Sequence, residues 1–118
     1  MRILIASALA LTSATPAFAQ ADAARGQTLY TSRCGGCHSV QTNRVGPKHL
    51  GVVGRKAGSV PGFEYSAALK KAKFVWTEKQ LDKWLQGPSK LVPGTAMAFT
   101  VPVPADRAAI IAYLKVAK

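Results

Sequence analysis

The stretch RCGGCHSV, residues 33–40, contains the only two cysteines of the chain, and a histidine directly follows the second. Paired cysteines serve four chemistries: a structural disulfide, a dithiol redox couple, a zinc site and covalent haem attachment. A disulfide between Cys34 and Cys37 would close a very small loop and would remove little entropy from the unfolded chain. Zinc needs four ligands, and the chain adds only His49 to these two cysteines and His38. A thioredoxin-like dithiol expects a preceding strand in a βαβ setting, which the pattern does not indicate.

Covalent haem explains the two cysteines and the histidine together. Each thiol can add to one vinyl group as a thioether, and the adjacent histidine is placed to bind the iron through Nε2. We therefore predict one haem c, attached through Cys34 and Cys37, with His38 as an axial ligand. Met97, the only methionine besides Met1, is the candidate for the second axial position. The alternative is that Met97 simply fills apolar space, as an isolated methionine usually does.

The first residues, MRILIASALALTSATPAFAQ, have the pattern of a secretory signal peptide. A basic residue precedes a short apolar run, and small residues form an A-x-A cleavage site at 17–19. We predict that residues 1–19 are removed, which leaves one domain of residues 20–118 in the periplasm. The alternative is an uncleaved N-terminal anchor. No later segment is apolar enough to span a membrane, so we expect a soluble product.

The chain is strongly basic, with 16 Lys and Arg against five Asp and Glu in 118 residues. Only Arg2 leaves with the predicted signal peptide, so the formal charge falls from +11 to +10 over the remaining 99 residues. Such basicity in an exported protein favours an acidic partner or an anionic membrane surface. Nucleic acid is not expected, because export and the lack of a recognition helix or stacking platform argue against it.

Helical spacing and capping residues predict four helices, at 22–34, 66–71, 77–86 and about 104–116. Asp22 is the expected cap of the first, and TEKQ at 77–80 is a capping box for the third. Glycine and proline interrupt residues 39–65 and 91–104 too often for regular elements. We find no repeats and no convincing strands. The sequence predicts an all-α domain in which long loops wrap around something other than protein.

Three runs carry a resemblance to a known family: GPKHLGVVGRKAGSVPGFEYS (46–66), LDKWLQGPSKLVPGTAMAF (81–99) and IIAYLK (110–115). They resemble class I cytochromes c, of the bacterial c2 and mitochondrial type, and the match covers residues 22–118. The resemblance implies the class I cytochrome c fold, with N- and C-terminal helices crossing beside the haem. Gly26 would allow a close approach at that crossing, and Tyr113 would pack near it.

The resemblance also implies roles for individual residues around the haem. Met97 would bind the iron opposite His38, and the Pro47 carbonyl would accept a hydrogen bond from His38 Nδ1. Phe99 would cover the ring edge. The residues that fall where the family binds the propionates are Arg55, Tyr65, Trp76 and, near the outer propionate, Thr95. Their alternative roles are a solvated arginine and ordinary core aromatic residues.

Two positions depart from the family pattern. Trp84 stands where the family usually has a tyrosine near the methionine sulfur. His49 stands where the family pattern has leucine, which here comes one residue later at Leu50. We expect His49 to be a surface or packing residue, with iron ligation as the alternative.

Histidine and methionine together would close the coordination of the iron, so the resemblance implies an electron carrier and not an enzyme. The expected donor is a cytochrome bc1-type complex. The expected acceptor is an acidic-faced terminal oxidase, a photosynthetic reaction centre or another periplasmic reductase. We expect a monomer that docks transiently through a basic face formed by Arg33, Arg44, Lys48 and Lys90. A haem enzyme or gas sensor is the rival, but it would need a polar distal pocket, and the segment around Met97 is apolar.

Overall fold

The computed structural model describes residues 17–118, with side chains described from Asp22 onward. Within this range no strand forms, and the one β-bridge joins Lys56 to Val75. The predicted all-α class is therefore confirmed. The helices are α1 (Ala17–Arg33), α2 (Ala67–Lys70), α3 (Glu78–Gln86), α4 (Pro88–Leu91) and α5 (Pro104–Val116).

Three predicted helices begin within one residue of the predicted position. Ser66 accepts a hydrogen bond from the backbone N–H of Leu69 at the start of α2, at 3.2 Å. Thr77 Oγ1 accepts from the backbone N–H of Gln80 at the start of α3, at 3.1 Å. Helix α5 begins at Pro104, whose missing N–H costs nothing in the first turn of a helix.

One predicted boundary was wrong, and one short helix was not predicted. Helix α1 begins at Ala17, so Asp22 lies inside the helix and does not cap it. The preceding AFAQA is rich in alanine, the strongest helix former, which explains the extension. Proline at 88 ends α3 as expected, but it also occupies the first position of the unpredicted α4. Residues 1–16 of the predicted signal peptide lie outside the described residues, and the predicted cleavage point after Ala19 falls within α1.

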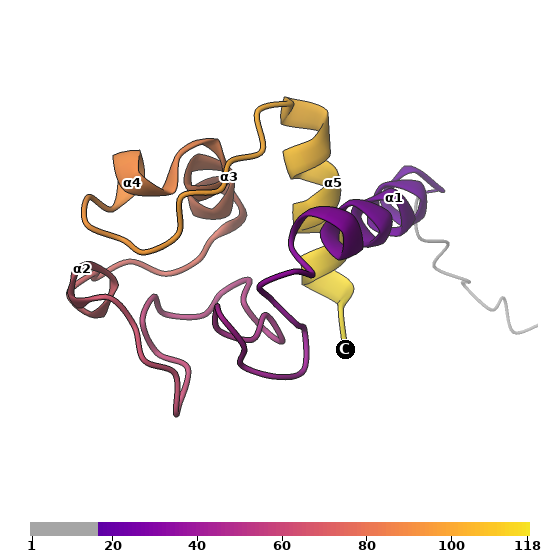
Figure 1. Cartoon of the computed structure of the whole chain (residues 1–118). Helices are drawn as coiled ribbons and strands as arrows, with labels where there is room; N and C mark the ends of the chain where they lie inside the picture. The colour runs from indigo at the N-terminus through magenta and orange to yellow at the C-terminus, as the bar shows by residue number, and fades with distance from the viewer. Residues whose placement is uncertain (1–16) are drawn as a thin grey trace, which may run out of the picture.

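Helices α1 and α5 cross and pack against each other on one side of the molecule (Figure 1). At the crossing, a Cβ on Gly26 would lie 1.8 Å from the carbonyl oxygen of Ala109 and 3.0 Å from Tyr113 Cβ. Only glycine permits this approach, and the predicted roles of Gly26 and Tyr113 at the crossing are confirmed. The α5 side chains Ile110, Ile111 and Leu114 are buried.

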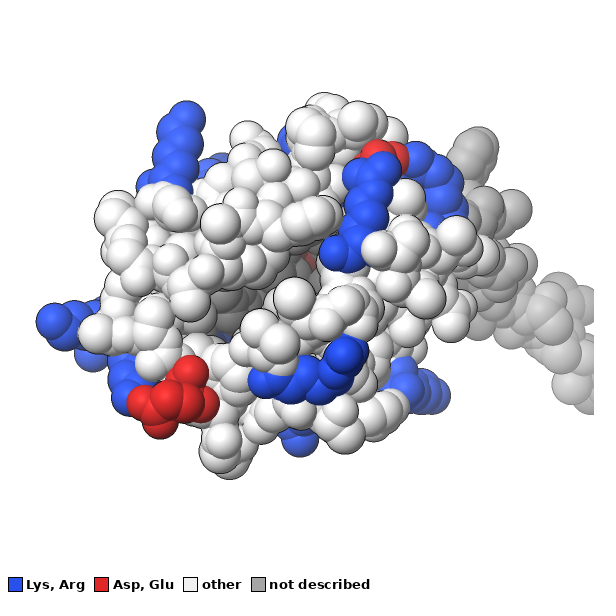
Figure 2. All heavy atoms as spheres, in the orientation of Figure 1, with Lys and Arg blue, Asp and Glu red and all other residues white. Residues whose placement is uncertain are grey.

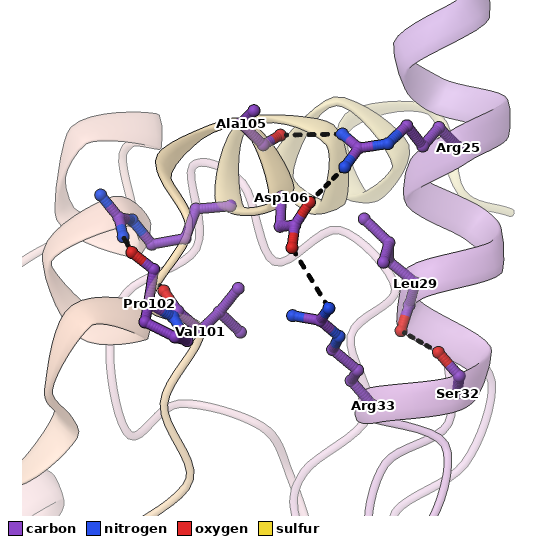
Figure 3. Close-up of polar contacts among 9 residues, drawn as sticks. Arg25, Leu29, Ser32, Arg33, Val101, Pro102, Ala105 and Asp106 are labelled. Carbon is purple, nitrogen blue, oxygen red and sulfur yellow. Dashed lines mark hydrogen bonds and ion pairs between the residues drawn. The ribbon is translucent and has the colours of Figure 1, made fainter.

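A buried carboxylate adds charge pairing to this crossing. Asp106, only 6% exposed, lies in the first turn of α5 and contacts two arginines of α1 (Figure 3). One oxygen pairs with Arg25, and the other lies 3.2 Å from Arg33. Since both partners come from the same helix, the carboxylate fixes the position of α1 along α5.

The remaining helices, α2, α3 and α4, lie on the other side, and long loops connect the two sides (Figure 1). Arg107 of α5 joins these parts, because it pairs with Asp82 of α3 at 2.7 Å. Its Nη1 also donates to the carbonyls of Val101 and Pro102, at 3.0 and 2.9 Å. No helix within residues 17–118 is long and apolar enough to cross a membrane.

Candidate haem site

Between the two sides lies a hollow, which opens on the face shown in Figure 2. It has a larger part of about 330 Å³ and a smaller part of about 70 Å³. The two parts adjoin, because the same six residues line both: Cys34, His38, Tyr65, Leu69, Trp84 and Met97. The two parts together form one hollow.

All eleven residues that the sequence predicted for the site line this hollow. Helix α1 and the turn after it bring the CxxCH residues, α3 brings Trp84, and loops bring the others. Several residues that the sequence did not single out also line it, notably the apolar side chains of α3 and α5 and the ring of Tyr30. The predicted residues are Cys34, Cys37, His38, Pro47, Arg55, Tyr65, Trp76, Trp84, Thr95, Met97 and Phe99.

The CxxCH residues form a tight turn at the end of α1. The backbone N–H of Cys34 donates to Tyr30 O, and that of His38 donates to Cys34 O, each at 2.8 Å. Both cysteines are free thiols in the structure; Cys34 is half-buried and Cys37 exposed. Burial raises the pKa of the Cys34 thiol to about 11. The turn thus presents two unpaired sulfurs to one hollow.

Arg44 holds this turn from outside. Its guanidinium donates to the carbonyls of Gly35, Gly36 and His38, at 2.5, 3.3 and 3.3 Å. These carbonyls belong to the turn that follows α1, so Arg44 provides them with hydrogen-bond donors.

The His38 ring is oriented so that one nitrogen is free. Nδ1 lies 2.9 Å from the carbonyl oxygen of Pro47, which can only accept, so Nδ1 carries the proton and Nε2 keeps its lone pair. Burial is the main cause that lowers the pKa of His38, and it favours the neutral imidazole. The backbone at Gly46 lies close to the ring, since a Cβ there would be 2.1 Å from His38 Cε1. A neutral imidazole with a free Nε2 is the form that binds iron.

Met97 lies on a loop that is tied down on both sides. The backbone N–H of Thr95 donates to Val92 O at 3.1 Å, and that of Val101 donates to Leu85 O at 2.7 Å. Met97 is half-buried, and Ala96, Ala98 and Phe99 beside it line the larger part of the hollow. The surroundings of its thioether are therefore mostly apolar, unlike the polar pocket that a haem enzyme would need.

Among the residues predicted to bind propionates, Arg55 and Tyr65 differ in whether their polar atoms already have hydrogen-bond partners in the protein. Arg55 Nη1 donates to Lys48 O and Leu50 O, at 3.0 and 3.3 Å. Arg55 Nε is buried and has no hydrogen-bond partner among the residues that the structure describes. Tyr65 accepts a bond from the backbone N–H of Val60 at 3.0 Å.

The residues of the hollow fit a haem on these observations. Two thiols, a neutral imidazole and a thioether face a largely apolar hollow, and a carboxylate near Arg55 would satisfy its buried Nε. Burial lowers the pKa of the Arg55 guanidinium, and a nearby anion would oppose this shift.

Only some of the residues predicted for the docking face have side chains that are not already engaged in contacts within the protein. Arg33 pairs with Asp106, and Arg44 holds the CxxCH turn, whereas Lys90 on α4 is exposed. Lys48 is half-buried, and its backbone N–H donates to Asn43 Oδ1 at 3.0 Å. On the face that contains the hollow, Lys and Arg clearly outnumber Asp and Glu (Figure 2).

His49 was expected to be a surface or packing residue, and the structure places it in the packing. It is half-buried beside His38, with ring centroids 4.1 Å apart and planes 21° apart. Its Nδ1 lies 2.9 Å from the hydroxyl of Tyr30. Burial is the main cause that lowers the pKa of His49, to about 3. Sequence reasoning marked His49 as unusual but had no signal for these two neighbours, which come together only in the fold.

Comparison with known proteins identifies the family. The family model for cytochrome c matches residues 23–118. Cytochrome c of Euglena viridis is 50% identical over 100 residues, covering 82% of this chain and 98% of the relative. Cytochrome c2 of Rhodomicrobium vannielii is 43% identical over 109 residues, covering 89% of this chain and 86% of the relative. The solved structure of cytochrome cH from Methylobacterium extorquens superposes with a TM-score of 0.76 at 45% identity, covering 80% of this chain and 97% of that one.

The chain belongs to the cytochrome c family. Its helical fold is that of the class I members, as the resemblance implied. Proteins of this family are electron carriers and not enzymes, and membership implies a covalently bound haem c.

Proposed function

We propose that this protein is an exported, periplasmic one-electron carrier whose haem iron is held by His38 and Met97. Cys34 and Cys37 would bind the haem through two thioether bonds. When bound, the haem supplies an Fe(III)/Fe(II) couple that accepts and releases one electron. The observation that carries the proposal is that both thiols, the free Nε2 side of His38 and the Met97 thioether belong to one hollow.

The protein's own groups would perform three tasks in this function. The Pro47 carbonyl keeps His38 in the tautomer that leaves Nε2 free. The tied loop around Met97 would hold the thioether where it can occupy the position opposite His38 and keep other ligands away. Arg55 would neutralise a propionate, since its buried Nε has no hydrogen-bond partner within the described part of the chain. A site that changes little between the two states needs little reorganisation during electron transfer.

For the cellular role, we propose transfer from a bc1-type complex to a terminal oxidase, a photosynthetic reaction centre or another periplasmic acceptor. The signal-peptide pattern of residues 1–19 supports export. Cleavage after Ala19 would shorten α1 by three residues and would keep Arg25, Gly26 and Arg33 at the crossing.

The test of the iron ligands is Met97→Ala in the haem-loaded protein. The oxidised wild type should show the weak near-infrared band of sulfur bound to ferric haem iron, and the variant should lose it. The variant should also bind cyanide and carbon monoxide much faster, because one coordination position becomes open. Val103→Ala is the matched control, since Val103 is exposed further along the same segment and should change neither property. Unchanged ligand access in Met97→Ala would show that Met97 does not bind the iron.

A further inference from the structure

Three aromatic side chains form a connected row that leads from the α1–α5 crossing to His38. Tyr30 of α1 is only 5% exposed and packs against Tyr113 of α5, with ring centroids 5.4 Å apart. Its hydroxyl lies 2.9 Å from His49 Nδ1. The His49 ring in turn stacks on His38, 4.1 Å away and inclined by 21°. The packing of α1 on α5 is thus linked through side chains to the ring of the proposed iron ligand.

The other contacts of His38 leave its rotation only partly restricted. The Gly46 backbone lies close to the ring and the hydrogen bond to Pro47 holds one edge, but a single bond to a carbonyl allows the plane to tilt. The near-parallel His49 ring lies against a face of His38 and opposes that tilt. His49 is itself held by its backbone N–H, which donates to Ser39 O at 3.1 Å, and by the Tyr30 hydroxyl.

The buried polar pair of Tyr30 and His49 beside His38 calls for a physical explanation. Burying an imidazole and a phenol costs free energy unless their polar atoms are paired, whereas leucine and phenylalanine would fill the same space without that cost. In this chain Tyr30 and His49 satisfy each other, and the bond between them fixes the angle at which His49 meets His38. Packing alone would not require such a directional contact.

We propose that Tyr30 and His49 act together as positioning residues that set the plane of the His38 imidazole, and so its orientation on the haem iron. This inference rests on the proposed function, in which His38 binds iron. The plane of an axial imidazole determines how unpaired spin is distributed over ferric haem. It therefore determines the hyperfine shifts of the haem methyl protons, which are independent of electron-transfer activity.

The experiment is proton NMR of the haem-loaded ferric protein with Tyr30→Phe, His49→Leu and the double variant. Tyr30→Phe removes only the hydroxyl. Tyr113→Phe is the matched control, because it removes a hydroxyl from the same aromatic cluster, whereas the His49 Nδ1 contact is made by the Tyr30 hydroxyl. Thermal melts of all four proteins show whether the fold is kept.

We expect the pattern of haem methyl shifts to change in Tyr30→Phe and to change further in His49→Leu. The double variant should match His49→Leu, since the Tyr30 hydroxyl acts only through His49. Tyr113→Phe should retain the wild-type pattern. Wild-type shifts in either His49→Leu or Tyr30→Phe would overturn the proposal. If His49→Leu fails to take up haem, Tyr30→Phe alone decides, because it keeps every ring in place.

The same spectra separate this inference from the function on which it rests. Strongly shifted His38 ring protons in the wild type show that His38 binds the iron, whatever the variants do. Their absence would overturn the ligand assignment itself. Their presence, with methyl shifts that do not respond to the variants, would overturn only the positioning role.

Discussion

At the scale of single residues, the geometry around His38 explains why small changes nearby should matter. The Pro47 carbonyl, the Gly46 backbone and the His49 ring surround the imidazole. Protein interiors are packed closely enough that one added methyl group must displace a neighbour. Here the neighbours of such a group would be the atoms of the proposed iron ligand.

Gly46→Ala should therefore destabilise the haem-loaded protein by about 1–3 kcal/mol and weaken the near-infrared sulfur–iron band. The added Cβ would lie 2.1 Å from His38 Cε1, so the ring or the loop has to move. Gly36→Ala is the control, since a Cβ there meets nothing within 4 Å. Denaturant unfolding followed by absorbance measures both effects. Equal stability of the two variants would contradict the close contact at Gly46.

At the scale of elements, short helices are held in place by a few long-range polar contacts. Helices α2 and α4 have four residues each, too few to be stable alone. Arg107 connects α5, α3 and the end of the Met97 loop through Asp82, Val101 and Pro102. Because Arg107 is only 7% exposed, water cannot easily replace these contacts.

Arg107→Met should lower the free energy of unfolding by about 2–3 kcal/mol, because it leaves two carbonyls without their donor and Asp82 without its cation. It should also raise the affinity of the ferric protein for added imidazole, since the Met97 loop opens more often. Asp82→Asn is the comparison, because it removes a charge but keeps the bonds from Arg107 to the carbonyls, so its effects should be smaller. Imidazole titration measures the affinity of each variant for imidazole, and denaturant unfolding measures its stability. A larger effect of Asp82→Asn would show that charge pairing, and not the hold on the loop, is what matters.

At the scale of the whole molecule, the hollow and the basic charge are the two dominant features. The hollow lies within the hydrophobic core, where other small domains have only packed side chains. Core residues from α3, α5 and the loops line it. A domain of this size buries only part of its apolar surface and has little stability to spare. The haem-filled hollow should then be the centre of the core.

Without haem, the chain should be largely unfolded. The measurement is circular dichroism of the variant with Cys34→Ala and Cys37→Ala, produced in the absence of haem. We expect weak helicity and no cooperative melt, because the longest loop of the described chain, residues 34–66, lines much of the hollow and the helices are short. A cooperative melt with native-like helicity would show that the protein core is sufficient.

Charge should control the encounter with electron-transfer partners. The rate with an acidic acceptor should fall as salt is added, since surface charges are screened over ~10 Å at ~0.1 M salt. Lys90→Glu should lower the second-order rate several-fold at low salt and flatten its salt dependence, without changing the spectrum. Lys79→Glu is the charge-matched control, as Lys79 is exposed on α3 and does not line the hollow. Stopped-flow kinetics over a salt series measures the rates. Identical effects of the two variants would assign the dependence to net charge and not to docking near Lys90.

The sequence by itself determined the features that depend on local rules. The CxxCH spacing predicts the attachment chemistry, and a capping box and a proline mark the starts of α3 and α5. The CxxCH pattern and the family resemblance together named eleven residues that all line the hollow. These signals are readable because each one lies within a few neighbouring residues or in an aligned motif. The misplaced start of α1 and the missed α4 belong to the same local level, where helix ends are least certain.

Only the tertiary structure decided which residues act together across the chain. Asp106 with Arg25, Arg107 with Asp82, and Tyr30 with His49 are separated by 81, 25 and 19 residues. No local pattern specifies such pairs, since each forms only when α1, α3, α5 and the loops have packed. The same packing engages Arg33 and Arg44 in contacts with other residues of the chain, although nothing in the sequence distinguishes them from other surface cations. It also stacks the ring of His49, whose role the sequence did not explain, on the ring of His38.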